Sequence, residues 1–414
     1  MSRLIFCLLL LPALALAQGA GSLSLKDAES LWREHSRELA LARVALAGAE
    51  ADVRTAGQAP NPALSLDVSS ISPWSGYGAG GWKDKKVDNV LRVEQLIERG
   101  GKRDLRVKGA EARREAASLD LSATGRLQLA MLRRAYFDLL LAQEKLKLAA
   151  ETADLYARTL EVAEKRLKVG DVAPVDVSRM SIDKARADND LRLARGDLEQ
   201  ARLALAYLIG RENEAQALQA NESWPNPNQD PLAENVSLDK RPDLAAAKLR
   251  MNAAEADRDL ARALRTRDVT IGAQYEHTNQ STPVNSYGVG ISVPIFLWHS
   301  HEGEIQRAEA DYDAARLTYE QQRALATGQV GQARSTLLAA RDRLLRMQSG
   351  LLGDAERVAK AAELAYGKGA MGLMDLLDAR RTLRQVQIEA ATARADYAKA
   401  LSDWQLQAEY EREK

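Results

Sequence analysis

Cysteine is almost absent from this sequence. The one cysteine, Cys7, lies in an apolar run over residues 4–16, which follows Arg3 and precedes a predicted cleavage site after Ala17. This layout is typical of a cleavable secretory signal, so we predict a signal peptide over residues 1–17. The mature chain would then hold no cysteine, which excludes a disulfide framework, a cysteine-ligated zinc finger and a cysteine nucleophile.

Aromatic residues are scarce, and neither sign of charge is in excess. Phe, Trp and Tyr make up 5% of the chain, and its 58 basic and 58 acidic residues cancel. The balanced charge gives no indication of nucleic-acid binding. Beyond the signal, no run approaches the roughly 20 apolar residues that a membrane-spanning helix needs. If the chain crosses a membrane, it must therefore do so as strands.

Catalytic patterns are missing as well. No Gly-rich phosphate loop follows a strand, no Gly-x-Ser-x-Gly motif occurs, and the four histidines build no catalytic constellation. We therefore expect neither an enzyme nor a cofactor.

What the sequence does contain is one structural unit written twice. In the first copy we predict a helix over 25–56, a strand over 64–68, a loop over 70–88 with Trp74, Tyr77 and Trp82, a strand over 90–97 and a helix over 102–167. In the second copy we predict a helix over 241–265, strands over 269–275 and 287–295, and a helix from near residue 303. The duplication predicts a first repeat over 18–215, a linker over 216–240 and a second repeat over 241–414.

The long helices carry coiled-coil seams, which are positions that recur at alternating steps of three and four residues along one helix face. The first-repeat seam consists of Leu139, Ala142, Leu146, Ala149, Ala153, Tyr156, Leu160, Ala163 and Leu167. The second-repeat seam consists of Leu376, Ala379, Leu383, Val386, Ala390, Ala393, Tyr397, Ala400 and Trp404. Small residues in both seams allow helices to approach closely. A helix over 102–167 would extend about 100 Å, which favours a long coiled coil over a compact bundle.

The four predicted strands each have one apolar face and about the length of a tilted strand that crosses a bilayer. Four strands cannot close a barrel, and an open edge in lipid would leave backbone groups unpaired. The pattern therefore predicts that several copies of the chain share one barrel. A pair of soluble periplasmic hairpins is the alternative interpretation.

Two related segments carry a family resemblance. Residues 170–177 (GDVAPVDV) and 369–376 (GAMGLMDL) each place an aspartate six residues after a glycine, and the two copies are offset by 199 residues. They resemble the paired helix-turn-helix tips of the TolC family of outer-membrane efflux proteins. Residues 93–103 and 291–296, where strands pass into long helices, are also similar to that family.

The resemblance implies a mainly α fold with a small membrane β part. Long α-helices would form a coiled-coil barrel in the periplasm, and four strands per chain would contribute to a twelve-stranded trimeric β-barrel in the outer membrane of a Gram-negative bacterium. The implied partners are two further copies in a homotrimer, outer-membrane lipid, a periplasmic adaptor (membrane fusion) protein and, indirectly, an inner-membrane pump. No nucleic acid is implied.

The expected function is the outer-membrane duct of a tripartite efflux system. The Gly-Gly-Lys-Arg sequence at residues 100–103 and the short linker look most like the members that serve cobalt-zinc-cadmium and copper export, so heavy-metal cations are the expected substrate. A duct for drugs or other organic compounds and a non-transporting periplasmic coiled-coil scaffold are the alternatives.

The resemblance also assigns roles to the tips. Adaptor docking is expected at Val169, Gly170, Val172, Gly369, Met371 and Leu373. Each glycine would supply the unusual backbone angles of a hairpin turn, and the exposed apolar residues would suit contact with another helical hairpin.

An acidic pair follows the second tip. Asp375 and Asp378 lie three residues apart and so share a helix face, where the trimer implied by the resemblance would gather six carboxylates at a periplasmic aperture. The alternative interpretation is helix capping, in which Asp375 accepts hydrogen bonds from free amides at the start of its helix. The first copy has Asp176 and Arg179 at the equivalent positions, so only the second copy carries an uncompensated acidic pair.

The family's gating link departs from its usual pattern here. Met371 stands where the family uses an arginine, so we expect closure to involve Tyr366 and Asp176, or packing alone.

A histidine pair offers the only metal candidate that the sequence suggests. His299 and His301 alternate on a predicted extended segment and so project to one side, with Glu302 and Glu304 beyond them. The other interpretation is a polar strand-to-helix junction in which these side chains cap the helix. We favour capping and expect no metal.

Overall fold

The computed structural model describes residues 22–71, 74, 76, 78–81, 85–229, 237–278 and 284–408. The predicted signal peptide over 1–17 lies outside the described residues, as do Tyr77 and Trp82 of the first predicted loop. Long helices make up most of the described chain, and two small sheets complete it. In this part of the chain, none of the helices combines the length and the apolar character needed to cross a bilayer.

The chain divides into two compact units. We call residues 1–38, 125–236 and 329–414 the tip unit, and residues 39–124 and 237–328 the sheet unit. Each unit contains segments of both predicted repeats. The repeats thus describe the order of elements along the chain, whereas the units describe which elements pack together.

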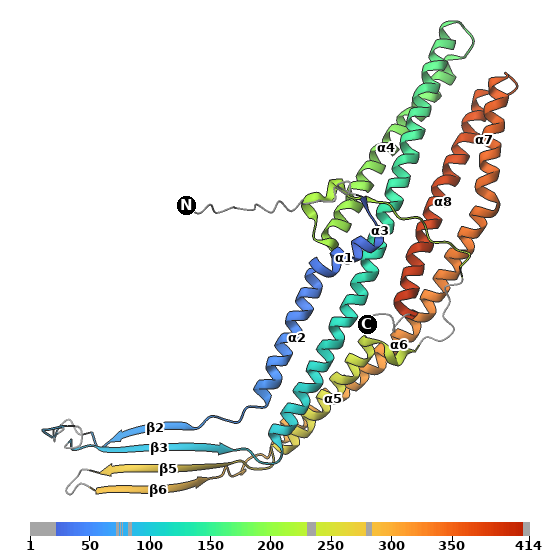
Figure 1. Cartoon of the computed structure of the whole chain (residues 1–414). Coiled ribbons are helices and arrows are strands. Elements are labelled where there is room, and N and C mark those ends of the chain that lie inside the picture. Colours follow the sequence, from blue (N-terminus) through green and yellow to red (C-terminus); the bar gives the residue numbers. More distant parts are fainter. Residues whose placement is uncertain are drawn as a thin grey trace, which may run out of the picture. The chain divides into compact units, whose positions relative to one another are not determined.

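The sheet unit is built around one four-stranded antiparallel sheet. It contains α2 (Arg37–Ala56), β2 (Ala63–Ser69), β3 (Asp88–Ile97), the first part of α3 (Lys102–Lys168), η3 (Leu238–Lys240), α5 (Pro242–Ala263), β5 (Val269–Thr278), β6 (Val284–Ser292) and the first part of α6 (Glu302–Arg346). The strand order is β2-β3-β5-β6, so the two predicted hairpins lie side by side (Figure 1).

The register of this sheet separates apolar from charged side chains. Along one face, Leu66 pairs with Leu91, Leu91 with Tyr275 and Tyr275 with Tyr287. The next rank on that face is Leu64, Val93, Ala273 and Val289, and all eight side chains are exposed. By strand alternation, the charged residues of the strands lie on the opposite face; they are Asp67, Asp88, Arg92, Glu94 and Glu276. The predicted alternation is therefore confirmed.

The last strand is shorter at its carboxyl end than the sequence suggested. The prediction extended it to residue 295, but β6 ends at Ser292. Pro294 explains the difference, because proline has no amide hydrogen to donate to a ladder and restricts the residue before it.

A buried lysine and a glycine hold the connection between β3 and α3 against the neighbouring chain. The Lys102 side chain is 6% exposed, and its Nζ lies 2.7 Å from Asp268 Oδ1 and 2.8 Å from the Thr266 carbonyl oxygen. Gly100 has a φ of +76°, and a Cβ built on it would lie 2.8 Å from the Cβ of Thr266. Only glycine fits this contact without a shift of the neighbouring chain.

The tip unit contains two helical hairpins. Its elements are β1 (Ser22–Leu23), α1 (Leu25–His35), the rest of α3, α4 (Pro174–Ile209), η2 (Glu212–Ala217), β4 (Gln219–Ala220), the end of α6, a π-helical turn η4 (Met347–Leu351), α7 (Leu352–Gly367) and α8 (Leu373–Ala408). The α3–α4 and α7–α8 hairpins each end in a short turn (Figure 1).

Two predicted helices are interrupted. The helix predicted over 25–56 breaks at Ser36, whose backbone is extended and whose hydroxyl donates to Glu38 Oε2 at 3.3 Å. Serine favours such breaks because its side chain competes for local hydrogen bonds. The helix predicted from near residue 303 is interrupted by η4 at residues 347–351, which periodicity did not reveal.

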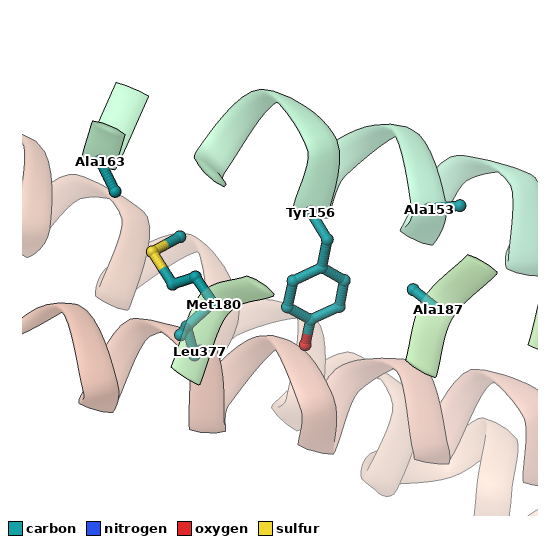
Figure 2. Close-up of a cluster of buried hydrophobic side chains, with 6 residues drawn as sticks. All are labelled: Ala153, Tyr156, Ala163, Met180, Ala187 and Leu377. Atoms are coloured by element: carbon teal, nitrogen blue, oxygen red, sulfur yellow. The ribbon is translucent and has the colours of Figure 1, made fainter. Parts of the chain in front are cut away.

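Most residues of both predicted seams are buried in the tip unit, and Leu146, Leu160, Leu167, Ala379 and Leu383 are half-buried. Leu139, Ala142, Ala149, Ala153, Tyr156 and Ala163 of α3 are buried, as are Leu376, Val386, Ala390, Ala393, Tyr397, Ala400 and Trp404 of α8. Helix α8 packs on both sides. Its Leu377 lies beside Met180 of α4, with Tyr156 of α3 extending toward it (Figure 2), while Tyr397 and Trp404 share a cluster with Leu337 of α6.

Gly100→Ala should destabilise the sheet unit more than Gly101→Ala. Both glycines have positive φ, but only Gly100 has a neighbour within 4 Å of an added Cβ. The shared backbone penalty cancels in the comparison, and the steric clash remains. We expect an additional loss of about 1–3 kcal/mol for Gly100→Ala, measured by thermal unfolding in detergent. Equal unfolding midpoints for the two variants would contradict the Thr266 contact.

Candidate functional site: the helical tips

The two tips have the same backbone hydrogen bonds. At the first tip, Gly170 N donates to the Leu167 carbonyl at 3.0 Å, and Asp171 N donates to the Arg166 carbonyl at 3.0 Å. These two bonds form a Schellman motif, which requires a left-handed residue after the helix, and Gly170 has a φ of +78°.

The second tip repeats this pattern. Gly369 N donates to the Tyr366 carbonyl at 3.0 Å, Ala370 N donates to the Ala365 carbonyl at 2.8 Å, and the φ of Gly369 is +72°. All partners are displaced by 199 residues from those of the first tip. The sequence offset therefore corresponds to a duplicated turn geometry.

The predicted docking residues differ in exposure. Val169 is 79% exposed, whereas Val172 and Met371 are half-buried. Leu373 is also half-buried and packs against the cluster that contains Met180 and Leu377. Leu373 thus contributes to hairpin packing as well as to the tip surface, which the sequence did not indicate.

An arginine that the sequence did not single out links the two tips. Arg166 Nη1 donates to the Tyr366 hydroxyl at 3.2 Å, and the guanidinium carbon lies 5.6 Å from the Tyr366 ring centroid. Arg166 Nε also lies 3.9 Å from Asp171 Oδ2. The internal repeat gave no signal for this contact, because the position equivalent to Arg166 in the second copy is Ala365.

The acidic residues near the tips have different surroundings. Asp176 Oδ1 lies 4.0 Å from Arg179 Nη1, in the same helix. Asp375 and Asp378 are exposed, and within the described residues they accept no side-chain hydrogen bond and form no ion pair. Asp176 thus has a basic partner in its own helix, and Asp375 and Asp378 have none in the described part of the chain. Tyr366 contacts Arg166, and no contact between Tyr366 and Asp176 accompanies it in the described chain.

Farther along the helices from the tips, ion pairs join α4 to α8. Arg381 donates to Asp183, whose side chain is only 6% exposed, and Arg384 Nη2 donates to Asp190 Oδ2 at 2.9 Å. Partial burial lowers the pKa of Arg381, but the hydrogen bond to Asp183, the charge of Asp183 and the contact with Tyr156 together outweigh it and leave the pKa raised. Because one carboxylate is buried, loss of its arginine partner would leave an uncompensated charge.

The histidine pair lies in the sheet unit, where α6 begins. His301 Nδ1 is 3.2 Å from Glu304 Oε1, and the Ser300 amide and hydroxyl both donate to Glu302. The Ser300 bonds lower the pKa of Glu302 to about 2, so this carboxylate is ionised at neutral pH. Within the described residues, no group of three His, Cys, Asp or Glu side chains is arranged to hold a metal ion. The contacts are those of a helix start.

The sequence profile of a family described as "outer membrane efflux protein" matches residues 30–211 and 235–403. The chain belongs to this family. The predicted family resemblance is thereby confirmed, and with it residence in the outer membrane and a role in efflux.

Two curated relatives and one solved structure show how this family member compares with others. The chain is 28% identical to the cobalt-zinc-cadmium resistance protein CzcC of Cupriavidus metallidurans, over 90% of this chain and 86% of the relative. It is 27% identical to the pyoverdine export outer membrane protein OpmQ of Pseudomonas aeruginosa, over 91% of this chain and 83% of the relative.

The crystal structure of the outer membrane protein VceC from Vibrio cholerae has the same fold, with a TM-score of 0.75 and 21% identity; the match covers 94% of this chain and 97% of that one. The predicted mainly α fold with a small β part is confirmed.

Loss of the Arg166–Tyr366 contact should loosen the tips. Tyr366→Phe keeps the ring beneath the guanidinium but removes the 3.2 Å hydrogen bond, whereas Arg166→Gln removes both interactions. We expect single-channel conductance in planar bilayers to rise more for Arg166→Gln than for Tyr366→Phe. The matched control is Arg158→Gln, which removes an exposed arginine paired only within α3. Conductance in Arg166→Gln equal to that of this control would contradict the role of the contact.

Proposed function

We propose that three copies of this chain form a duct that receives heavy-metal cations from a periplasmic adaptor and an inner-membrane pump. The unpaired carboxylates of Asp375 and Asp378 at the second tip carry this proposal. Around a threefold axis they would form a ring of six negative charges, and a narrow acidic ring concentrates cations.

The need for several copies follows from the sheet. In the described chain, β2 pairs only with β3, and β6 pairs only with β5, so each of these strands has one free edge. A free edge in lipid costs several kcal/mol for each unpaired backbone group. Edge-to-edge pairing of β6 with β2 of the next copy would satisfy both edges, and three copies would give twelve strands. The number three comes from the family resemblance.

Charge on the strands supports passage of cations. The face opposite the apolar one carries four acidic side chains and one arginine. With the apolar face against lipid, this acidic face would line the interior of the duct. The acidic interior and the acidic pair at the second tip would then both attract cations.

The tips are the proposed contact with the adaptor. Val169, next to Gly170, is 79% exposed, and Met371, two residues after Gly369 at the other tip, is half-buried. Exposed apolar residues at the end of a helical hairpin suit docking of another helical hairpin.

The choice of metal cations over organic compounds rests on the CzcC likeness together with the acidic pair. The similar identity to OpmQ, a pyoverdine export protein, keeps an organic substrate as the second candidate. A non-transporting scaffold is disfavoured, because family membership already gives a role in efflux.

Resistance profiles distinguish these candidates. A strain lacking the gene should be sensitive to zinc, cobalt and cadmium salts, and the wild-type gene should restore growth. Val169→Glu should fail to restore it although trimers assemble, because a charge at the tip opposes apolar docking. His299→Ala with His301→Ala should restore growth fully, since we expect neither histidine to bind the exported metal. Sensitivity of the deletion strain to organic compounds alone would refute the metal proposal.

The acidic pair should control cation selectivity. We expect Asp375→Asn with Asp378→Asn to lower the preference for cations over anions and to weaken block by a trivalent cation in planar bilayers, without loss of trimers. Glu151→Gln with Glu164→Gln is the matched control, because it removes two exposed acidic groups of α3 that have no ion pair in the described chain. Unchanged selectivity and block in the aspartate variant would show that these residues do not line the aperture.

A further inference from the structure

The apolar face of the sheet ends at a boundary where charged residues take over. On β3 and β5 that boundary lies after Ile97 and before Val269. We call residues 98–106, 265–268 and 293–304 the rim. All three segments belong to the sheet unit. They are close in space, since the Arg99 amide donates to Asp268 Oδ1 at 2.9 Å and the Arg267 guanidinium lies 5.3 Å from the Phe296 ring centroid.

Large apolar side chains remain uncovered at this rim. Leu297 is 74% exposed and Trp298 is 94% exposed, and both follow the end of β6. Burial of a tryptophan and a leucine is favourable by roughly 2–3 kcal/mol each, so their exposure beside a lipid-facing sheet calls for a covering partner. Tryptophan is enriched where a membrane protein leaves the hydrocarbon layer.

The rim also carries four exposed arginines. They are Arg99, Arg103, Arg265 and Arg267. Within the described residues, the side chains of Arg99 and Arg103 form no hydrogen bond or ion pair.

Most acidic groups of the rim are already engaged. Glu98 pairs with Arg106, Asp268 with Lys102, Glu302 with Ser300 and Glu304 with His301. The remaining carboxylate is that of Asp104, in the first turn of α3. Ser300 is uncharged and His301 carries a charge only when protonated, so Glu302 and Glu304 keep their negative charges. The four exposed arginines therefore face three carboxylates, those of Asp104, Glu302 and Glu304, and the rim keeps a small positive net charge.

We propose that the rim binds the headgroups of anionic phospholipids while Leu297 and Trp298 insert among the acyl chains. Arginine suits this ligand because its planar guanidinium matches phosphate oxygens in a bidentate geometry. Leu297 and Trp298 anchor the rim at the bilayer surface, and the arginines select lipids with anionic headgroups. The proposal depends on residence in a membrane and is independent of the exported substrate.

Lipid retention on the assembled full-length protein tests the selection. The protein is reconstituted in an equimolar mixture of phosphatidylglycerol and phosphatidylcholine, extracted, and analysed by native mass spectrometry. We expect preferential retention of phosphatidylglycerol. The combined substitutions Arg99→Gln, Arg103→Gln and Arg267→Gln should reduce that preference by about fivefold for each arginine, the factor that one basic residue near an anionic leaflet contributes.

The matched control removes three other exposed arginines of the same unit, Arg43, Arg54 and Arg323, by substitution with Gln. It should keep the wild-type preference. Equal retention of both lipids by the wild type, or the same loss in both triple variants, would overturn the selection of anionic headgroups.

Fluorescence tests the inserted tryptophan. The difference in quenching between wild type and Trp298→Phe, in vesicles with brominated acyl chains, isolates Trp298 from the other five tryptophans of the chain. We expect strong quenching by bromines near the headgroup end of the acyl chain and weak quenching by bromines near its methyl end. Absence of any Trp298-dependent quenching would place this residue in water and overturn the proposed insertion.

Discussion

The packing of the tip unit depends on how closely α8 approaches the helices around it. One face of α8 buries alternating small and large seam residues, and Ala391, Ala395 and Ala398 are buried as well. Small side chains let the backbones come close, so each large side chain contacts several neighbours. A helix buried on two faces cannot rotate or slide without losing contacts on both. This constraint holds the α7–α8 tip in register with the α3–α4 tip.

That register decides which charges are available for function. It places Arg381 opposite Asp183 and Arg384 opposite Asp190, where partial burial makes separation of each pair costly. It also brings Arg166 to Tyr366. The carboxylates of Asp375 and Asp378 remain exposed at the start of α8. The same helix thus uses its arginines for assembly of the hairpins and leaves its first acidic residues exposed.

The sheet unit follows a different constraint, which is the two-residue alternation of strands. Every charged residue in the strands lies on one face, and the ranks of apolar residues lie on the other. This separation lets one sheet contact lipid and line a polar interior together. Where the strands end, alternation ends too, and arginines, a tryptophan and the starts of two long helices meet within a few residues. The Lys102–Asp268 pair and Gly100 hold these segments together.

The sequence by itself determined the local features of this protein. Heptad spacing located both seams, alternation located the strands, and the glycines at 170 and 369 located the two turns, because each of these patterns depends on hydrogen bonds and side-chain directions within a few residues. The tips also carried the family resemblance, and Asp375 and Asp378 could be distinguished from Asp176 by the neighbouring Arg179.

Only the tertiary structure decided the partnership of Arg166 with Tyr366, the half-burial of Leu373 and the second buried face of α8. The break at Ser36 and the π-helical turn at 347–351 likewise escaped periodicity. The physical reason is that spacing shows which residues share a face of their own helix, whereas contacts between segments about 200 residues apart depend on the register at which the packed helices meet.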